Sequence, residues 1–434
     1  MKKTGIIFFL AVMVFCWQNS IAQKSDDMVG KKNKLRLIVT SDVGGTDPDD
    51  KQSMVHLMTY SDVFDLEGII SSPWGPGRKS HILEVIDAYE KDYENLKTWS
   101  DFPTPDELRA IAKQGAIDVR PDPGWAEPTE GSKWIVECAK RPDPRPLYIA
   151  NWGAIDDVAQ ALHDAPEIAE KIRIYWIAGP NRQRGRDPKP MAPNRYMEAE
   201  FKDMWWIQAD QTYRGMFNGG NMSGEWSNGS FPKTNVVGHG ALGAYWKTIS
   251  KQDLKMGDTP SILFYLNNDI SDPTKEGWGG AFIRYENGTN WWRDNPASNV
   301  KEGSFMGAKT VNKWRQDFLG HWKNRMDWCT AKNPTPYKKE ETGISKRNTA
   351  NSNASLMVIS CINNVLNITN VNHMGKAGQG ELFNLSGASV MKFNLAQNMS
   401  SHQITMQRVL PGIYLVKISV GATNIIKSLV KVSE

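Results

Sequence analysis

Hydrophobic and polar residues follow two different patterns along the first three quarters of the chain. Short runs rich in Ile, Leu and Val have the length of buried strands, at 35–40, 64–72, 146–150 and 172–178. Between these runs the apolar residues recur at helical spacing, as they do over 78–93. Strands that alternate with helices predict an α/β fold with a mostly parallel sheet flanked by helices.

The pattern changes after residue 331. Residues 332–355 are polar, charged and rich in threonine, which is typical of a linker. From residue 356 onward, short alternating runs are separated by Gly and Asn turns, and this pattern predicts a small all-β sandwich over 356–434. The sequence therefore predicts a large α/β domain over 35–331 and a small β domain at the end.

The N-terminus has the features of a secretory signal. Two lysines precede an apolar run at 6–15, and small residues follow at 20–22. We place the signal at 1–22 and a polar leader at 23–34. The apolar run is too short for a comfortable membrane span, and no later run reaches that length. We therefore expect an exported protein without a membrane span.

Composition narrows the expected partners. Charged residues make up 23% of the chain and the formal net charge is +4, with two of the lysines in the signal, so no nucleic acid polymer is expected as a partner. The 17 tryptophans indicate either an aromatic-lined pocket or a core filled by indoles. Three cysteines follow the signal, Cys138, Cys329 and Cys361, and both one disulfide and buried free thiols stay open.

The strongest chemical signal is a turn between the first strand and the first helix. It carries four carboxylates, Asp42, Asp47, Asp49 and Asp50, with two glycines among them. Carboxylates this close repel one another and raise each other's pKa, and a hard cation such as Ca²⁺ relieves that repulsion through oxygen ligands. The alternative is that one of the aspartates caps the helix and the rest are solvated. Four carboxylates together favour a functional site.

Several short motifs occur in one order through this domain. They are Leu37–Ser53, Phe64–Ile70, Tyr213–Met216, Gly238–Ala244, Gly257–Ser261 and Asp272–Gly280. Together they resemble the nucleoside hydrolase superfamily, and within it an exported family described as cellulose-binding and nucleoside-hydrolase-like. The resemblance implies a nucleoside-hydrolase-type fold, a calcium ion, and hydrolysis of a glycosidic (N- or O-glycosyl) bond.

Carried over residue by residue, the resemblance implies a metal site. Asp50 resembles the bidentate calcium ligand, and Asp42 resembles the ligand that also acts as general base. Asp49 resembles the carboxylate that binds sugar hydroxyls. Asp272, which follows an apolar strand-like run at 260–266, resembles a late calcium ligand. In such a site a water beside calcium loses its proton to Asp42 and attacks the anomeric carbon.

The sequence also departs from the family pattern. Thr40 stands where the family has its first Asp, and Asp47 is an additional carboxylate that can compensate as a metal ligand. Ser271 stands where many nucleoside hydrolases have a histidine that protonates the leaving group. Asn151 or Trp152 occupies the place where the family supplies a backbone carbonyl.

The remaining substrate-binding candidates each have a structural alternative. His239 is a substitute leaving-group acid or a structural residue at a helix start. Arg214 binds substrate or forms a structural ion pair. Glu200 lies in the irregular region where a sugar-binding Glu would fall. The tryptophans at strand ends or loops stack on a sugar or pack the loop, and they are Trp74, Trp152 and Trp278.

The C-terminal region resembles the type A sorting domain of the type IX secretion system. The matching segments are Glu381–Gly387, Leu410–Lys417 and Lys427–Val432. This resemblance implies that the type IX secretion machinery is a partner, and that the protein passes through the periplasm to be secreted or held at the cell surface.

Two functions follow from these observations. The first is an exported calcium-dependent hydrolase that acts on a glycoside or oligosaccharide. The alternative is a non-catalytic protein that binds plant polysaccharide on the same fold. Thr40 and Ser271 favour the alternative, whereas the intact set Asp42, Asp49 and Asp50 favours the enzyme.

Overall fold

The chain divides into two units, Met1–Lys339 and Glu340–Glu434, and each is described by itself. The computed structural model describes residues 34–44, 47–73, 78–179, 191–286, 288 and 290–337 of the first unit, and 357–362, 365–370, 378–384, 389–396, 401–406, 409, 412–420 and 423–431 of the second. The predicted signal at 1–22 lies outside these residues. The boundary between the units falls inside the predicted linker at 332–355.

The first unit is built on one eight-stranded sheet. Its strands lie in the order β3-β2-β1-β4-β5-β6-β8-β7. All neighbours are parallel except the edge pair β7 and β8. The strands are β1 (Arg36–Ser41), β2 (Asp65–Ser71), β3 (Ala112–Gln114), β4 (Leu147–Trp152), β5 (Ile172–Ile177), β6 (Trp205–Ala209), β7 (Phe282–Arg284) and β8 (Trp291–Asp294). The predicted mostly parallel α/β sheet is confirmed.

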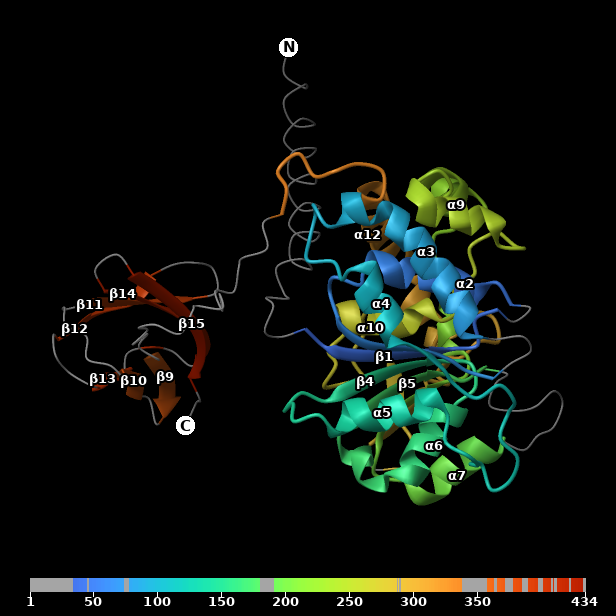
Figure 1. Cartoon of the computed structure of the whole chain (residues 1–434), viewed down its shortest axis with the longest axis horizontal. Helices are drawn as coiled ribbons and strands as arrows, with labels where there is room; N and C mark the ends of the chain where they lie inside the picture. Colours follow the sequence, from blue (N-terminus) through green and yellow to red (C-terminus); the bar gives the residue numbers. More distant parts are fainter. Residues whose placement is uncertain are drawn as a thin grey trace, which may run out of the picture. The chain divides into compact units, whose positions relative to one another are not determined.

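Helices cover both faces of this sheet (Figure 1). One face carries α2 (Asp49–Thr59), α3 (Lys79–Leu96), α4 (Pro105–Ile111), α9 (Gly240–Thr248), α10 (Thr259–Asn267) and α12 (Arg315–Trp328). The other carries α5 (Glu130–Lys140), α6 (Asp156–Asp164) and α7 (Ala192–Glu200). Shorter helices are α8 (Ser230–Asn235), α11 (Lys309–Asn312), η1 (Pro166–Glu170), η3 (Thr212–Met216), η4 (Gly224–Trp226) and η5 (Ser298–Val300).

Each strand buries side chains on both faces, as a covered parallel sheet requires. In β1, Leu37 and Val39 join the core beneath α2 and α3, while Ile38 joins the core beneath α5 and α6. Cys138 and Cys329 are buried free thiols in these two cores. The side chain of Cys361 lies outside the described residues.

One predicted strand is a helix. The apolar run at 260–266 forms α10, whose residues are almost all buried in the core. Pro260 lies in its first turn, a position that suits proline because the missing N–H has no helical partner there. An apolar run of this length does not distinguish a buried strand from a buried helix by periodicity alone. Asp258, which precedes the helix, therefore faces the sheet edge, and the residues that follow the helix do not.

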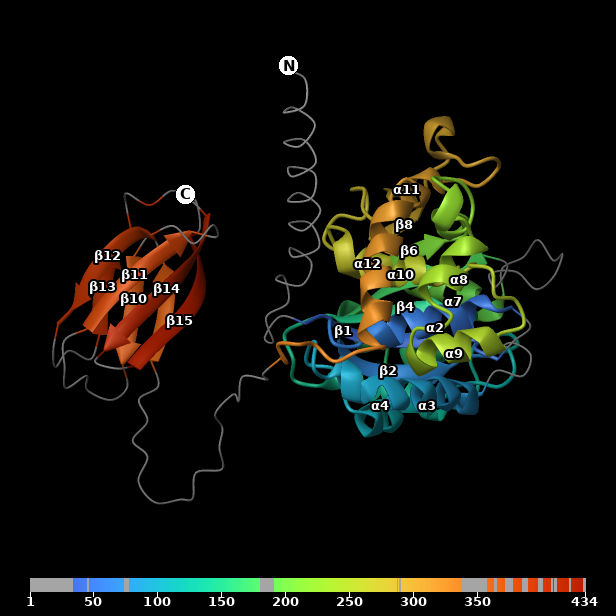
Figure 2. The same cartoon turned by 90° about the horizontal axis from the view of Figure 1, so that it is seen from above.

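The described residues of the second unit form seven antiparallel strands in two sheets, ordered β13-β10-β9 and β12-β11-β14-β15 (Figure 2). Buried residues of both sheets share one core, including Leu366, Leu382 and Val416. The predicted small all-β sandwich is confirmed. Its strands are β9 (Met357–Ile362), β10 (Val365–Asn370), β11 (Gly378–Asn384), β12 (Ser389–Leu395), β13 (Ser401–Thr405), β14 (Gly412–Val420) and β15 (Thr423–Lys431).

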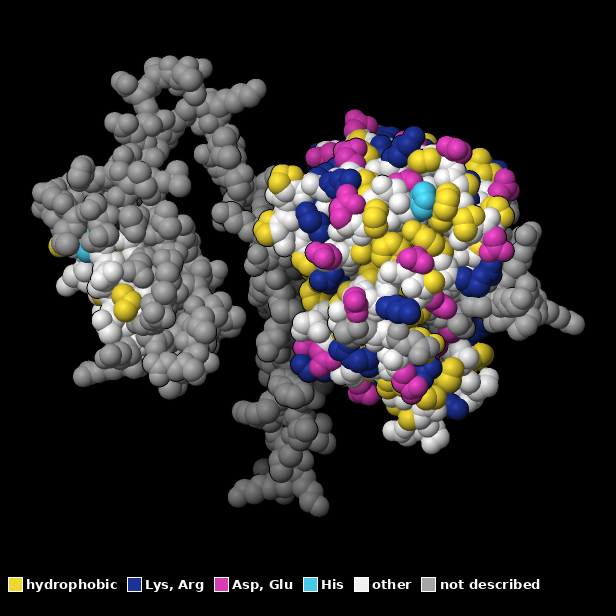
Figure 3. All heavy atoms as spheres, turned by 90° about the horizontal axis from the view of Figure 1, so that it is seen from below, with side chains coloured by type: hydrophobic (Ala, Val, Ile, Leu, Met, Phe, Trp, Pro, Cys, Tyr) yellow, Lys and Arg dark blue, Asp and Glu magenta, His cyan; other side chains and the backbone are white. Residues whose placement is uncertain are grey.

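The surface of the first unit carries charges of both signs. On the face drawn in Figure 3, basic and acidic side chains are interspersed among exposed apolar atoms. Within the part of the chain that the structure describes, no helix has the length and apolar character needed to cross a membrane.

The buried His56 and the half-buried His321 make the α2–α12 contact sensitive to acid. His56 stacks on Tyr60 with ring centroids 4.5 Å apart, and the Tyr60 hydroxyl lies 2.6 Å from Nδ1 of His321. Burial lowers the pKa of His321 to about 4 and that of His56 well below its usual value. The unfolded chain binds a proton at each of these imidazoles near pH 6.5, whereas the folded chain does not. Each histidine therefore lowers the free energy of unfolding as the pH falls below that value.

We therefore expect the His321→Gln variant to become more stable relative to wild type as the pH falls. When the pH falls from 7 to 4, the unfolding free energy of the variant relative to that of wild type should rise by up to about 3 kcal/mol. Denaturant unfolding of both proteins at the two pH values measures this shift. A difference between the two proteins that stays the same at both pH values contradicts the prediction.

Candidate functional site

The carboxyl end of β1 positions the first carboxylate. Asp42 follows the strand directly and is buried against Gly153, which follows the neighbouring strand β4. A Cβ atom at Gly153 would lie 2.6 Å from the Asp42 carboxylate, and the glycine has a φ of +91°. Only glycine allows this close approach in this conformation. The backbone of β4 therefore holds Asp42 at the strand edge.

The N-terminus of α2 supplies two more carboxylates. Asp49 and Asp50 lie in its first turn, and both are buried. The Ser41 hydroxyl donates a hydrogen bond to Oδ1 of Asp50 over 2.6 Å. Unpaired N–H groups at a helix start favour negative charge, which explains why carboxylates are tolerated here.

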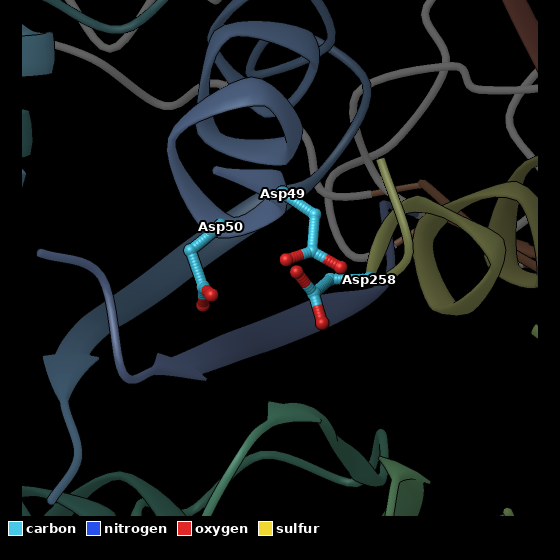
Figure 4. Close-up of side chains that lie close together, drawn as sticks. All are labelled: Asp49, Asp50 and Asp258. Carbon is cyan, nitrogen blue, oxygen red and sulfur yellow. The ribbon is translucent and has the colours of Figure 1, made fainter. Parts of the chain in front are cut away.

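The fourth buried carboxylate comes from the opposite side. Asp258 precedes α10, and one oxygen from each of Asp49, Asp50 and Asp258 lies within 4.8 Å of the others. Figure 4 shows the three side chains pointing toward one another from α2 and α10. Among the described residues, Oδ2 of Asp258 has no hydrogen-bond partner. We call Asp42, Asp49, Asp50 and Asp258 the acidic cluster.

Burial and mutual repulsion disfavour charge in the acidic cluster. Burial, reinforced by the charges of neighbouring carboxylates, raises the pKa of Asp42, Asp49 and Asp258 well above the usual value. Burial raises the pKa of Asp50 to about 6. Lys255 provides local compensation, with Nζ 3.4 Å from Oδ2 of Asp49. Four buried carboxylates beside one lysine form a donor set that suits a hard divalent cation.

Asp47 lies at the rim and not among the buried carboxylates. It is half-exposed and forms an ion pair with Lys255. Burial opposes its charge, but hydrogen bonds with Asp49 and Lys255 outweigh burial and lower its pKa. The additional carboxylate of the turn therefore fixes Lys255 beside Asp49.

The structure does not bring Asp272 to the acidic cluster, so its assignment as the late metal ligand is corrected. Asp272 is exposed and accepts hydrogen bonds from the hydroxyl and the backbone N–H of Thr274, over 2.6 and 3.1 Å. The physical reason is that the preceding apolar run is a helix, which reverses the end that faces the site. Asp258 takes the place expected for Asp272.

Asn151 and Trp152 hold the site together from β4. The Thr40 hydroxyl donates to Oδ1 of Asn151 over 2.7 Å, so Thr40 supports the end of β4. The Trp152 ring is fully buried, and its N–H donates to the hydroxyl of Ser261 on α10 over 2.7 Å. A buried ring does not stack on a sugar, so the packing alternative holds for Trp152.

The other predicted contacts lie outside the acidic cluster. Trp278 is buried with its ring centroid 5.6 Å from that of His321. His239 stands at the start of α9, and its Nε2 lies 3.2 Å from a carboxylate oxygen of Asp327 on α12. This contact fits the structural alternative for His239. Arg214 lies over the rings of Tyr213 and Phe305, and Glu200 is exposed at the end of α7. Trp74 lies outside the described residues.

Besides Asp258, two further residues at the site are not predicted from the sequence. Lys255 precedes α10, and no local pattern marks it. His81, in the first turn of α3, packs against Gly44 of the acidic turn, where a Cβ atom would lie 2.0 Å from its Nδ1. Nδ1 accepts a hydrogen bond from the backbone N–H of Arg78 over 3.2 Å. The proton of a neutral His81 is then on Nε2, which makes it a donor.

Two family models match the chain. One, described as cellulose-binding Sde182, nucleoside hydrolase-like domain, matches residues 36–282. The other, described as secretion system C-terminal sorting domain, matches residues 362–432. No curated protein is significantly similar to the sequence.

One solved structure supports the fold. A nucleoside hydrolase-related hypothetical protein from Saccharophagus degradans, associated with carbohydrate metabolism, is 19% identical with a TM-score of 0.55, covering 92% of this chain and 99% of its own. Two further structures are more distant. They are the effector protein XOO4466 (11% identity, TM-score 0.44, 72% of this chain and 99% of its own) and an inosine-uridine preferring nucleoside hydrolase from Bacillus anthracis (14% identity, TM-score 0.39, 68% of this chain and 99% of its own).

The first family model covers more than half of the chain and contains β1, the acidic turn and α10. The second covers β10 to β15 of the C-terminal β unit, which is a type IX sorting domain and directs export to the cell surface or the medium. This protein therefore belongs to the family of cellulose-binding Sde182, nucleoside hydrolase-like domains.

Proposed function

We propose that this protein is an exported, calcium-dependent hydrolase of glycosidic bonds. The observation that carries the proposal is the convergence of buried carboxylates from the β1–α2 turn and from the start of α10, within 4.8 Å of one another. The donor set fits calcium, since all its atoms are carboxylate oxygens and Oδ2 of Asp258 lacks a partner among the described residues. Asp42, Asp50 and Asp258 are the proposed ligands.

Each carboxylate has a separate role in this proposal. A bound calcium ion supplies positive charge beside which water loses a proton more readily. Asp42 takes that proton, since burial holds its pKa above the usual value and Gly153 fixes its position. Asp49, held by Lys255, accepts hydrogen bonds from the sugar hydroxyls.

His81 is the proposed hydrogen-bond donor, through Nε2–H of its neutral imidazole, to the negative charge that develops on the leaving group. It replaces His239, whose imidazole is held by Asp327. We expect His81→Gln to lower kcat by about 10²-fold on substrates with poor leaving groups, and much less on aryl glycosides whose leaving group needs no proton. Calcium affinity should stay unchanged. Steady-state kinetics on both substrate types, with His239→Gln as the matched control, measure the effect. An equal loss on both types contradicts the assignment.

The second candidate is a non-catalytic carbohydrate-binding protein on the same fold. The description of the matching family as cellulose-binding favours it. So does Ser271, which lies in an exposed turn with its hydroxyl donating to Asp269 and offers no acid to the acidic cluster.

One experiment separates the two candidates. Wild-type protein is incubated with nucleosides, aryl glycosides and plant-polysaccharide oligomers in calcium, and glycan binding is measured in parallel. Turnover of at least one class, lost in excess chelator, supports the hydrolase. Saturable glycan binding without turnover of any of them overturns it in favour of the binding protein.

A further inference from the structure

A pocket of about 260 Å³ opens at the carboxyl ends of β6 and β8, outside the acidic cluster. Its polar lining includes Gln208 and Asp210 at the end of β6, Arg293 on β8 and Glu198 on α7. Its aromatic lining consists of Trp291 and Tyr285, from β8 and the turn before it. We call it the β6–β8 pocket.

The aromatic wall of the pocket is rigid. Trp291 stacks on the buried Trp206 with ring centroids 4.5 Å apart and planes 9° apart. Tyr285 meets Trp291 edge-on at 4.7 Å, and the guanidinium of Arg293 lies over the Tyr285 ring at 4.8 Å. Trp291 is only 4% exposed and closes the wall as core packing, so the aromatic surface that a ligand can reach is that of the half-buried Tyr285, with the cation of Arg293 beside it.

The polar wall is also fixed by the fold. The carboxylate of Asp294, at the end of β8, accepts hydrogen bonds from three successive backbone N–H groups, at Asp210, Gln211 and Thr212, over 3.0, 2.8 and 3.0 Å. This clamp sets the turn between β6 and η3. Asp210 is thereby held at the pocket by a buried anchor.

Gln208 carries the observation that points to a ligand. Its side chain lines the pocket yet is only 6% exposed. Its Nε2 donates to Asp210 over 3.2 Å, whereas Oε1 has no hydrogen-bond partner among the described residues. A buried amide oxygen without a donor is unfavourable, and a ligand that brings a hydroxyl or N–H group satisfies it.

The lining selects the chemistry of that ligand. Among the described lining residues, the carboxylates of Glu198, Asp210 and Asp294 outnumber the cation of Arg293, which disfavours an anionic ligand such as a phosphate. A purely apolar ligand leaves Gln208 unsatisfied. A sugar ring combines an apolar face for the Tyr285 ring with hydroxyl donors for Oε1 of Gln208. The volume lies just below the range of about 300–1,000 Å³ for ligand pockets, which suits one ring.

We propose that the β6–β8 pocket binds one sugar unit of an oligosaccharide, as a subsite beside the acidic cluster. The helix η3 follows Asp210 of the pocket and leads toward the acidic cluster. Its Tyr213 packs at Gly257, where a Cβ atom would lie 3.4 Å from the Tyr213 ring and 2.4 Å from Oδ2 of Asp49. The proposal rests on the proposed function for a glycan ligand, and it deepens that function by making the ligand a chain of sugars.

The test compares two glutamates of one helix. Glu198→Gln changes a pocket residue, whereas Glu200→Gln changes an exposed residue at the end of α7 and is the control. Gln208→Met is the second pocket variant. Cellohexaose, xylohexaose and mannohexaose are titrated calorimetrically into each purified protein, with and without calcium. Thermal unfolding and calcium titration accompany each variant.

We expect wild type to bind at least one of these oligomers, with about tenfold weaker binding in each pocket variant. Glu200→Gln, the unfolding temperature and calcium affinity should not change. Persistence of this pattern in chelator supports the pocket even if the acidic cluster binds no calcium or catalyses nothing. Unchanged affinity in both folded pocket variants, or no binding of any of the three oligomers by wild type, overturns the proposal.

Discussion

Replacing Asp258 by Asn is expected to reduce calcium affinity by about 100-fold. The variant keeps the size of the side chain but removes one of the buried charges that converge within 4.8 Å. Because Asp258 precedes α10 and its Oδ2 lacks a partner among the described residues, no hydrogen bond to that atom is lost. Isothermal titration with calcium at pH 7.5 measures the change.

Asp272→Asn is the matched control for this measurement. Asp272 is exposed and hydrogen-bonds Thr274, so we expect the control to bind calcium like wild type. The pair of variants separates the two assignments of the late ligand. Wild-type affinity in Asp258→Asn, or a large loss in Asp272→Asn, would show that α10 does not supply the ligand.

The second large effect is expected for Asp42→Asn. Loss of the general base should lower kcat by about 10²–10⁴-fold at saturating calcium. The amide fits the space beside Gly153 as the carboxylate does. Because burial and Asp50 raise the pKa of Asp42, removing its charge should also stabilise the metal-free protein. Steady-state kinetics and thermal unfolding in chelator measure both effects.

This combination separates a catalytic loss from unfolding. A slower enzyme with an equal or higher unfolding temperature supports the role of Asp42, since stability gained at the expense of activity is typical of strained sites. Asp47→Asn, at the half-exposed rim, is the control and should retain most of the activity. Undiminished turnover in Asp42→Asn at saturating calcium excludes Asp42 as the base.

The central part of the sheet was predictable from sequence. Strands β1, β2, β4 and β5 agree with the predicted runs to within about two residues, because parallel strands buried on both faces form continuous apolar runs. The acidic turn was found for a different reason. Four carboxylates at a strand-to-helix turn are a local signal, which needs no knowledge of distant parts of the chain.

The distant part of the site was not predictable in the same way. Asp258 follows no strand, and the apolar helix after it has the length and composition of a buried strand. The edge strands β3 and β7, and β8 beside β7, have three or four residues each, too few to show a period. The β6–β8 pocket depends on β8, so no sequence pattern indicates it.

The roles of the tryptophans depended on burial, which residue type alone does not reveal. Trp152 and Trp278 lie at the predicted places in the chain, yet the fold turns both rings into the core. Trp291 closes one wall of the β6–β8 pocket and is also buried, in a segment without a predicted element. An indole suits a core and a sugar surface equally well, so only the tertiary structure separates the two roles.

The rate of glycoside hydrolysis by wild-type protein at increasing free calcium tests the central claim most directly. On the best substrate of the panel, we expect the rate to rise with the occupancy of one calcium site measured on the same sample, and to vanish in excess chelator. A rate that persists unchanged in chelator, or no hydrolysis at full calcium occupancy, would contradict a calcium-dependent hydrolase.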